Sequence, residues 1–80
     1  MKRIGKIFIL PKKEVLDPQG KAVTSALHSL GFAEVVDVRV GRFIELALND
    51  GSDERVREMC EKLLANTVVE DYTLEIVFEG

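Results

Sequence analysis

The side chains that most often carry out chemistry are scarce in this sequence, which has one histidine, His28, and one cysteine, Cys60, in 80 residues. A histidine could transfer protons near neutral pH and a thiolate could attack an electrophile, but each normally needs an activating partner. His28 falls inside a predicted helix beside serines, and Cys60 belongs to an apolar helical stripe. We therefore interpret His28 as a surface or packing residue and Cys60 as a buried structural thiol.

The acidic residues and glycines do not form a recognised reactive motif either. Asp50 and Asp53 are close in sequence, but turn formation and helix capping explain both. The sequence contains no Gly-rich phosphate loop, no nucleophile elbow and no pair of metal-ligand clusters. A single cysteine excludes an internal disulfide, and a single histidine argues against a zinc site. We expect no catalytic, cofactor-binding or metal-binding residues in this chain.

Length and composition favour a single small domain over residues 1–80, with 46% hydrophobic residues and a net charge of −3. A core of this size is marginal, which favours association with other chains. The acidic balance argues against nucleic acid as a partner. No apolar run approaches a membrane span, and the free cysteine without an export signal predicts a cytoplasmic protein. Bases concentrate in residues 1–13 and acids in residues 53–80, so we expect salt bridges between them.

The first half of the chain predicts a strand followed by a well-delimited helix. Residues 4–10 are rich in β-branched and aromatic side chains and end at a proline, which indicates an inner strand. Asp17 is a suitable N-cap, Pro18 a favoured first helical residue, and Gly31 a helix terminator. Between them, an apolar stripe recurs at helical spacing, formed by Val23, Ala26, Leu27 and Leu30.

The second half predicts a hairpin, a second helix and a closing strand. Residues 34–48 alternate as two strands joined at Gly41-Arg42, although the register of this hairpin stays open. After a turn at residues 49–52, a helix is expected over residues 53–65, with an apolar face and a Glu58–Lys62 pair. Either Ser52 or Asp53 can cap it. Asn66 can end that helix in a left-handed conformation, and residues 72–78 alternate as a strand.

The element order β-α-β-β-α-β predicts the α+β class, and within it a ferredoxin-like sandwich. In that fold a four-stranded antiparallel sheet carries both helices on one face. The opposite sheet face has no helix over it, so apolar side chains such as Phe8 should meet solvent or another subunit. We expect a homo-oligomer built through the sheet.

Two segments are more specific than the fold requires. Gly20 lies within the first helical turn, where glycine is unfavourable by about 1 kcal/mol relative to alanine. It therefore suggests the close approach of another backbone or a ligand, although a local turn could also explain it. The second segment is the loop over residues 66–71, which is more apolar than a simple connector needs.

Three motifs in the expected order resemble the PurS family over nearly the whole chain. They are Leu16-Asp17-Pro18-Gln19-Gly20, then Val38-Arg39-Val40-Gly41-Arg42 with Glu45, and finally Lys62-Leu63-Leu64-Ala65-Asn66 with Val69-Glu70-Asp71-Tyr72. One departure is the short connection over residues 49–53, where relatives often carry several more residues. That difference should shorten a loop and leave the motifs intact.

The resemblance implies a non-catalytic subunit of phosphoribosylformylglycinamidine synthase in purine biosynthesis. Such a subunit forms homodimers or tetramers, bridges a PurQ-type glutaminase and a PurL-type synthetase, and supports ammonia transfer between them. ATP and magnesium are then expected in the synthetase subunit, not in this chain. The candidate partner contacts are Asp17, Pro18, Gln19, Gly20, Arg39, Gly41, Arg42 and Asn66. The alternative is a ferredoxin-like regulatory module that binds a small metabolite at a dimer interface.

Overall fold

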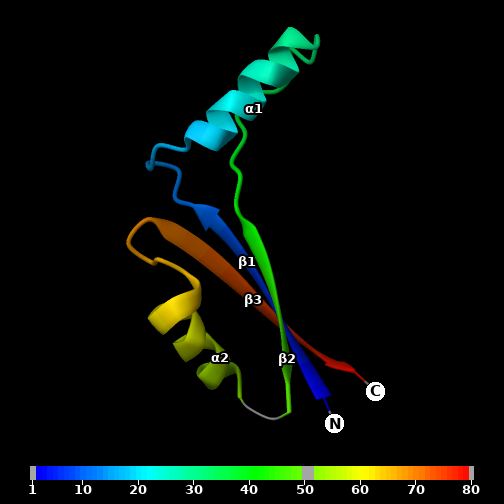
Figure 1. Ribbon diagram of the computed structural model, residues 1–80, viewed down its shortest axis with the longest axis vertical. Coiled ribbons are helices and arrows are strands. Elements are labelled where there is room, and N and C mark those ends of the chain that lie inside the picture. Colours follow the sequence, from blue (N-terminus) through cyan, green and yellow to red (C-terminus); the bar gives the residue numbers. More distant parts are fainter. Residues whose placement is uncertain (1, 50–51, 80) are drawn as a thin grey trace.

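The computed structural model describes residues 2–49 and 52–79 and has the expected α+β class. Its elements are β1 (Lys2–Pro11), α1 (Pro18–Ser29), β2 (Arg42–Leu48), α2 (Asp53–Met59), the π-helical turn η1 (Cys60–Leu64) and β3 (Glu70–Glu79). Both outer strands run antiparallel to β1, which lies in the centre of the sheet order β2-β1-β3 (Figure 1). The inner position predicted for the first strand is thus confirmed.

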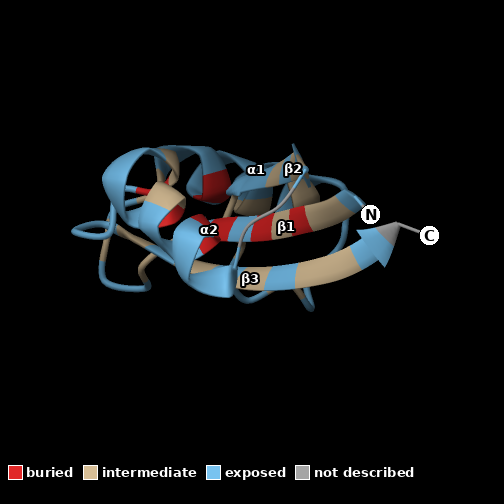
Figure 2. Ribbon diagram, turned by 90° about the horizontal axis from the view of Figure 1, so that it is seen from below, coloured by how far each residue is buried: buried red, intermediate tan, exposed pale blue. Residues whose placement is uncertain are grey.

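A small core forms where β1 meets α2 and η1 (Figure 2). It consists of Ile7, Ile9, Val56, Cys60 and Ala65, all buried. The buried position expected for Cys60 is confirmed, and burial raises the pKa of its thiol. Alternation along β1 sends its other side chains to the opposite face of the sheet.

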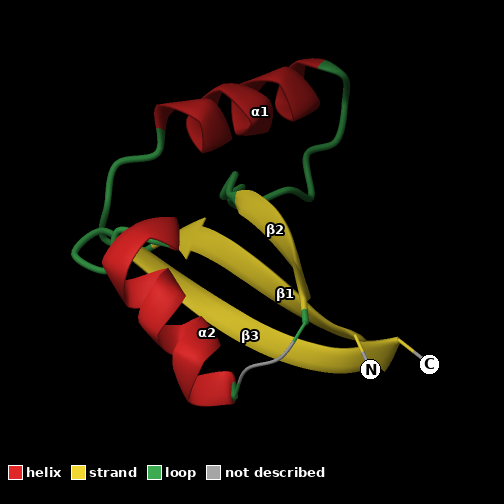
Figure 3. Ribbon diagram, turned by 60° about the horizontal axis from the view of Figure 1, so that its bottom comes forward, coloured by secondary structure: helices red, strands yellow, loops and turns green. Residues whose placement is uncertain are grey.

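That opposite face is open, as the sequence predicted. Phe8 and Phe43 are neighbours in the β1–β2 register, and their ring centroids lie 4.9 Å apart. Both side chains are exposed, because α2 covers only the other face of the sheet (Figure 3). The sheet therefore leaves an aromatic pair accessible.

The expected four-stranded sheet is not formed in the single chain, whose described residues make three strands. The first half of the predicted hairpin, residues 34–40, is instead extended along α1. Two contacts explain this path: the Val40 amide donates to Asp17, and His28 Nε2 lies 2.7 Å from the Val35 carbonyl oxygen. The predicted turn at residues 49–52 includes Asp50 and Gly51, which lie outside the described residues.

The expectation that both helices cover one sheet face is wrong for α1. Residues 18–41, called the finger below, extend beyond the end of the sheet (Figures 1 and 3). The caps predicted for its helix are confirmed, since Asp17 accepts from the Gly20 amide and Gly31 has φ 98°. The radius of gyration is 16.0 Å, whereas about 12 Å is typical of a compact 80-residue domain. The apolar stripe of α1 is consequently not buried in the core.

The second helix begins as predicted but ends differently. Ser52 caps it, and Lys62 pairs with Glu58 at 2.9 Å. The change to π-helical geometry at η1 rotates the last apolar residues, so that Leu63 is 83% exposed rather than part of the apolar face. The left-handed ending expected at Asn66 is wrong, because the only positive-φ residue described is Gly31.

The predicted pairing of the basic and acidic ends of the sequence is confirmed. Arg3 lies 3.2 Å from Asp53, and Lys12 lies 2.9 Å from Asp71. The charge asymmetry along the sequence therefore reflects contacts between neighbouring elements.

Candidate functional site

The base of the finger is held by Asp17. One carboxylate oxygen accepts from the Gly20 amide and the other from the Val40 amide, each at 3.0 Å. These backbone hydrogen bonds, that of Gly20 first, lower the pKa of Asp17. A β-carbon at Gly20 would overlap the carbonyl oxygen of Val38. The close approach predicted from Gly20 is thus confirmed, and the approaching backbone belongs to the chain itself.

Two further motif residues attach the finger to the end of β1. The Arg39 guanidinium donates to the Pro11 carbonyl oxygen at 3.1 Å. A β-carbon at Gly41 would overlap the Ile9 carbonyl oxygen and lie 2.9 Å from a Leu10 methyl group. The second motif therefore contains a glycine because the backbone at Gly41 packs against the β1 backbone without space for a side chain.

A second cluster, the Arg42–Glu70 clasp, joins β2 to the end of η1 and the start of β3. Arg42 donates to both carboxylate oxygens of Glu70, at 2.7 and 3.2 Å, and to the Leu64 carbonyl oxygen at 2.8 Å. The Asn66 amide donates to Glu70 at 2.8 Å. The Asn66 bond first, and then Arg42, lower the pKa of Glu70.

The structure brings the finger base and the clasp together at one end of the sheet. Arg42 directly follows Gly41, and the Lys12 amide donates to the Val69 carbonyl oxygen at 2.9 Å. Pro18, Gln19 and Asn66 are exposed at this end, whereas Gly20 is buried. Most of the predicted contact residues therefore also hold the chain's own elements in place.

Sequence reasoning missed the partners that these residues have within the chain. Val38 and Leu64 contribute through backbone carbonyl oxygens, which any residue type could supply. Glu70 lies within the third motif, next to the predicted strand, but pairing with a residue 28 positions away cannot be read from local spacing. The exposed Val68 agrees with the apolar character noted for the loop over residues 66–71.

Among residues 2–49 and 52–79, no group of three or more histidine, cysteine or acidic side chains is arranged to hold a metal ion. No helix in these same ranges is long and apolar enough to cross a membrane.

We expect Asp17→Asn to destabilise the protein at neutral pH. The asparagine side chain has one acceptor oxygen and no negative charge, so it can accept only one of the two backbone hydrogen bonds, and that one is weaker. The folded-state pKa of Asp17 lies below its unfolded value, so its stabilisation is full above about pH 4 and is lost as the pH falls further. Urea unfolding at several pH values should show the difference between wild type and variant shrinking with acid. Asp37→Asn, at an exposed acid of the finger, is the control, and an equal effect there would contradict the assignment.

Together, these features define a small α+β protein of the kind that works in an assembly. Its motif residues hold the finger and the clasp in place, and its sheet face and finger leave apolar side chains exposed. The phosphoribosylformylglycinamidine (FGAM) synthase PurS family model matches residues 5–78. The chain belongs to the PurS family. It is thus a PurS-type subunit of FGAM synthase, an enzyme of purine biosynthesis.

The similarity extends over most of the sequence and the structure. Subunit PurS of phosphoribosylformylglycinamidine synthase from Bacillus subtilis is 53% identical over 74 residues, covering 89% of this chain and 88% of the relative. A crystal structure of B. subtilis PurS has a TM-score of 0.84 at 49% identity and covers 98% of this chain and 100% of that one. A chain in the structure of PurLQS from Thermotoga maritima has a TM-score of 0.82 at 27% identity, covering 96% and 99%.

Proposed function

We propose that this chain is the non-catalytic bridge between a PurQ-type glutaminase and a PurL-type, ATP-dependent synthetase. The observation that carries the proposal is the likeness to a chain of the T. maritima PurLQS structure over 96% of this chain. The use of the motif residues supports it, because Asp17, Arg42 and Glu70 are engaged in holding backbone segments. Such residues maintain the shape of a docking surface.

The partner surface would be the end of the sheet that carries the finger base and the clasp. Pro18, Gln19 and Asn66 are exposed there, and the Arg42 side chain is half-exposed, so these four can contact a partner directly. The remaining candidates act from within the fold: Asp17 and Arg39 hold the finger base, and Gly20 and Gly41 allow its close packing. Each of the eight candidate contact residues thus has a proposed role, either in direct contact with a partner or in holding the finger base.

Docking would support ammonia transfer by closing the path between the two partner active sites. Ammonia that escapes into bulk water is diluted and protonated, so exclusion of solvent preserves its nucleophilic form. ATP and magnesium would bind in the synthetase subunit, and the assembly would work in the cytoplasm. In this arrangement residues 1–80 act as one domain.

The chain would do this as a homo-oligomer. The open sheet face exposes Phe8 and Phe43, and the finger leaves Leu30 and Val36 in solvent. Apolar surface of this extent is typical of interfaces. We include the four-stranded, ferredoxin-like sheet in this proposal as an arrangement completed on assembly, with a second chain beside the free edge of β2.

Light scattering after size-exclusion chromatography tests the bridge. Glutaminase and synthetase subunits mixed with ATP, magnesium and glutamine should co-elute only when this chain is added. Gln19→Glu with Asn66→Asp should weaken co-elution, while Glu54→Gln, at an exposed position of α2 outside the proposed surfaces, should not. Co-elution of the two large subunits without this chain would contradict bridging. A metabolite that stabilises the isolated chain would instead favour the regulatory alternative.

A further inference from the structure

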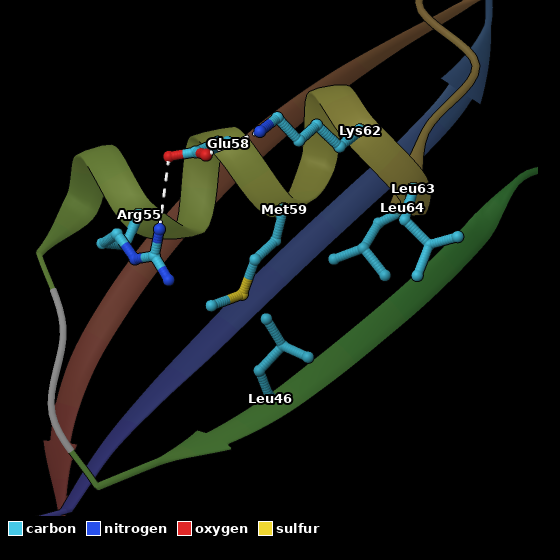
Figure 4. Close-up of a pocket in the computed structure, with 7 residues that line it drawn as sticks. All are labelled: Leu46, Arg55, Glu58, Met59, Lys62, Leu63 and Leu64. Carbon is cyan, nitrogen blue, oxygen red and sulfur yellow. Dashed lines mark hydrogen bonds and ion pairs between the residues drawn. The ribbon is translucent and has the colours of Figure 1, made fainter.

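Two pockets of similar volume differ in whether their charged groups are already paired. The first, of about 390 Å³, lies between α2, η1 and β2, where Met59 and Leu46 point toward each other (Figure 4). At its edge, Arg55 and Lys62 both pair with Glu58, at 3.5 and 2.9 Å. Its charged groups therefore engage one another, and apolar contact is the main interaction that it offers a ligand.

The second pocket, of about 410 Å³, lies on the open face of the sheet, at the end next to the finger base. Phe8 pairs with Thr73 in the β1–β3 register, and Leu10 pairs with Asp71, so these four lining side chains share the face that α2 leaves uncovered (Figure 3). Tyr72 completes the apolar wall. A cavity of about 150 Å³ accommodates a benzene ring, so this pocket has room for a two-ring system with a polar substituent.

The donors around this second pocket have unused hydrogen-bonding capacity. The Arg39 guanidinium carries several N–H groups, and the Pro11 carbonyl oxygen accepts from one of its nitrogens at 3.1 Å. Lys13 and Thr73 also line the pocket, and neither side chain forms a hydrogen bond or ion pair with another of the described residues. A carboxylate or phosphate in the pocket would give all three groups an acceptor.

The charges around the pocket also favour an anion. Asp71 is already paired with Lys12 at 2.9 Å. Among the described lining residues, this leaves Glu14 to oppose the two bases Lys13 and Arg39. The excess of positive charge favours a ligand with an anionic group. The aromatic wall favours a ligand in which that group is attached to a flat ring.

We propose that this pocket binds a small aromatic or heterocyclic anion. The ring lies against Phe8 and Leu10. The carboxylate or phosphate accepts hydrogen bonds from Arg39, Lys13 and Thr73. Because Arg39 belongs to the finger base and the other groups belong to β1, β3 and the loop after β1, the ligand ties the finger base to the sheet.

This inference goes beyond the bridging role, because the pocket is formed within a single chain and needs no partner subunit. It also differs from the regulatory alternative, in which the ligand lies at a dimer interface. It gives Arg39 a second role besides its hydrogen bond to Pro11.

Titration of the wild-type chain with naphthyl phosphate, followed by amide NMR, gives the first test. The signals of Lys13, Arg39 and Thr73 should move together, with a dissociation constant below about 1 mM. Naphthoate, tested in parallel, shows whether a carboxylate can replace the phosphate. Inorganic phosphate lacks the ring and naphthol lacks the anionic group, so each should bind at least about 10-fold more weakly. Equal binding of inorganic phosphate, or no shift at these three residues, would overturn the proposal.

Opposite charges at one exposed position test where the anion lies. Thr73→Glu places a carboxylate beside the bound anion and should weaken the binding of naphthyl phosphate by at least about 10-fold. Thr73→Lys, a side chain of similar length with the opposite charge, should not weaken it. Thr73 is exposed, so circular dichroism should show an unchanged fold for both variants. Equal weakening by the two variants would contradict an anion at this position.

A second pair of variants separates the pocket from the net charge of the chain. Lys13→Gln should weaken the binding of naphthyl phosphate by about 5-fold, because it removes one of the pocket's donors. Lys2→Gln removes the same charge from an exposed position at the other end of β1 and should change binding less than about 2-fold. If both variants weaken binding equally, the probe responds to net charge and the pocket is wrongly assigned.

The dependence on protein concentration separates this inference from the proposed function. A site within one chain should bind naphthyl phosphate with the same dissociation constant at all protein concentrations. If binding occurs only where chains associate, or if the probe separates associated chains in sedimentation runs, the pocket belongs to an interface between copies and this inference is wrong. Bridging of the two larger subunits is judged separately by their co-elution.

Discussion

Replacing Gly41 with alanine should destabilise the protein by about 3 kcal/mol, near the upper end of typical overpacking effects. The added β-carbon would overlap the Ile9 carbonyl oxygen and lie 2.9 Å from a Leu10 methyl group. The obstacle is the backbone of the central strand, which cannot move without disturbing its pairing with β2 and β3. The destabilisation by Gly41→Ala should come from steric overlap and not from an unfavourable backbone angle, because Gly41 does not have a positive φ. Among the described residues, Gly31 is the one that does.

Gly20→Ala should have a similar effect for a similar reason. Its β-carbon would overlap the Val38 carbonyl oxygen and lie 2.5 Å from Oδ2 of Asp17. Alanine normally stabilises a helix relative to glycine by about 1 kcal/mol, so the sign of the change distinguishes close packing from helix propensity. Gly5→Ala is the matched control, because its nearest contacts would be ordinary ones at 3.7–3.8 Å. Urea unfolding that shows all three variants equally stable would contradict the account of the finger base.

Removing the guanidinium fork of the clasp, by Arg42→Lys, should lower the unfolding free energy by about 1.5 kcal/mol. Charge-assisted bidentate hydrogen bonds contribute roughly 1.5–3 kcal/mol, and the lower end applies because the Arg42 side chain is 51% exposed. Lysine retains the charge but cannot reach Glu70 and the Leu64 carbonyl oxygen with the same geometry. The loss of unfolding free energy should therefore come from the changed hydrogen-bond geometry more than from a change in charge.

A double-mutant cycle of Arg42→Ala with Glu70→Gln measures this pair directly. We expect a coupling energy above about 1 kcal/mol, since both residues belong to one network. The same cycle at Lys12 and Asp71, an ion pair with one largely exposed partner, should give a smaller coupling energy. Equal coupling in the two cycles would show that the clasp contributes no more than an ordinary surface salt bridge.

Local signals in the sequence predicted most of the secondary structure correctly. The N-cap at Asp17, the terminator at Gly31 and the cap at Ser52 are confirmed because each depends on residues within a few positions. The central position of β1 follows from its apolar character on both faces. The uncovered sheet face and the buried thiol of Cys60 also follow from alternation and helical spacing.

The path of residues 34–41 could not be predicted in the same way. Alternating valines favour a strand, but a strand needs a neighbour, and here the Val40 amide donates to Asp17 instead of to another strand. Alternation gives no information about that competing partner, which is 23 residues away. The π-helical turn at η1 was missed because apolar spacing alone does not distinguish π from α geometry near a helix end.

The central claim, that this chain couples two enzymes without performing chemistry, is tested most directly by comparing two nitrogen sources. The purified glutaminase and synthetase subunits are assayed for amidine formation with and without this chain, first with glutamine and then with ammonia. We predict that omission abolishes most of the glutamine-dependent rate and leaves the ammonia-dependent rate largely unchanged. If omission lowers both rates equally, the chain is needed by the synthetase reaction itself, and if it lowers neither, the chain does not couple them.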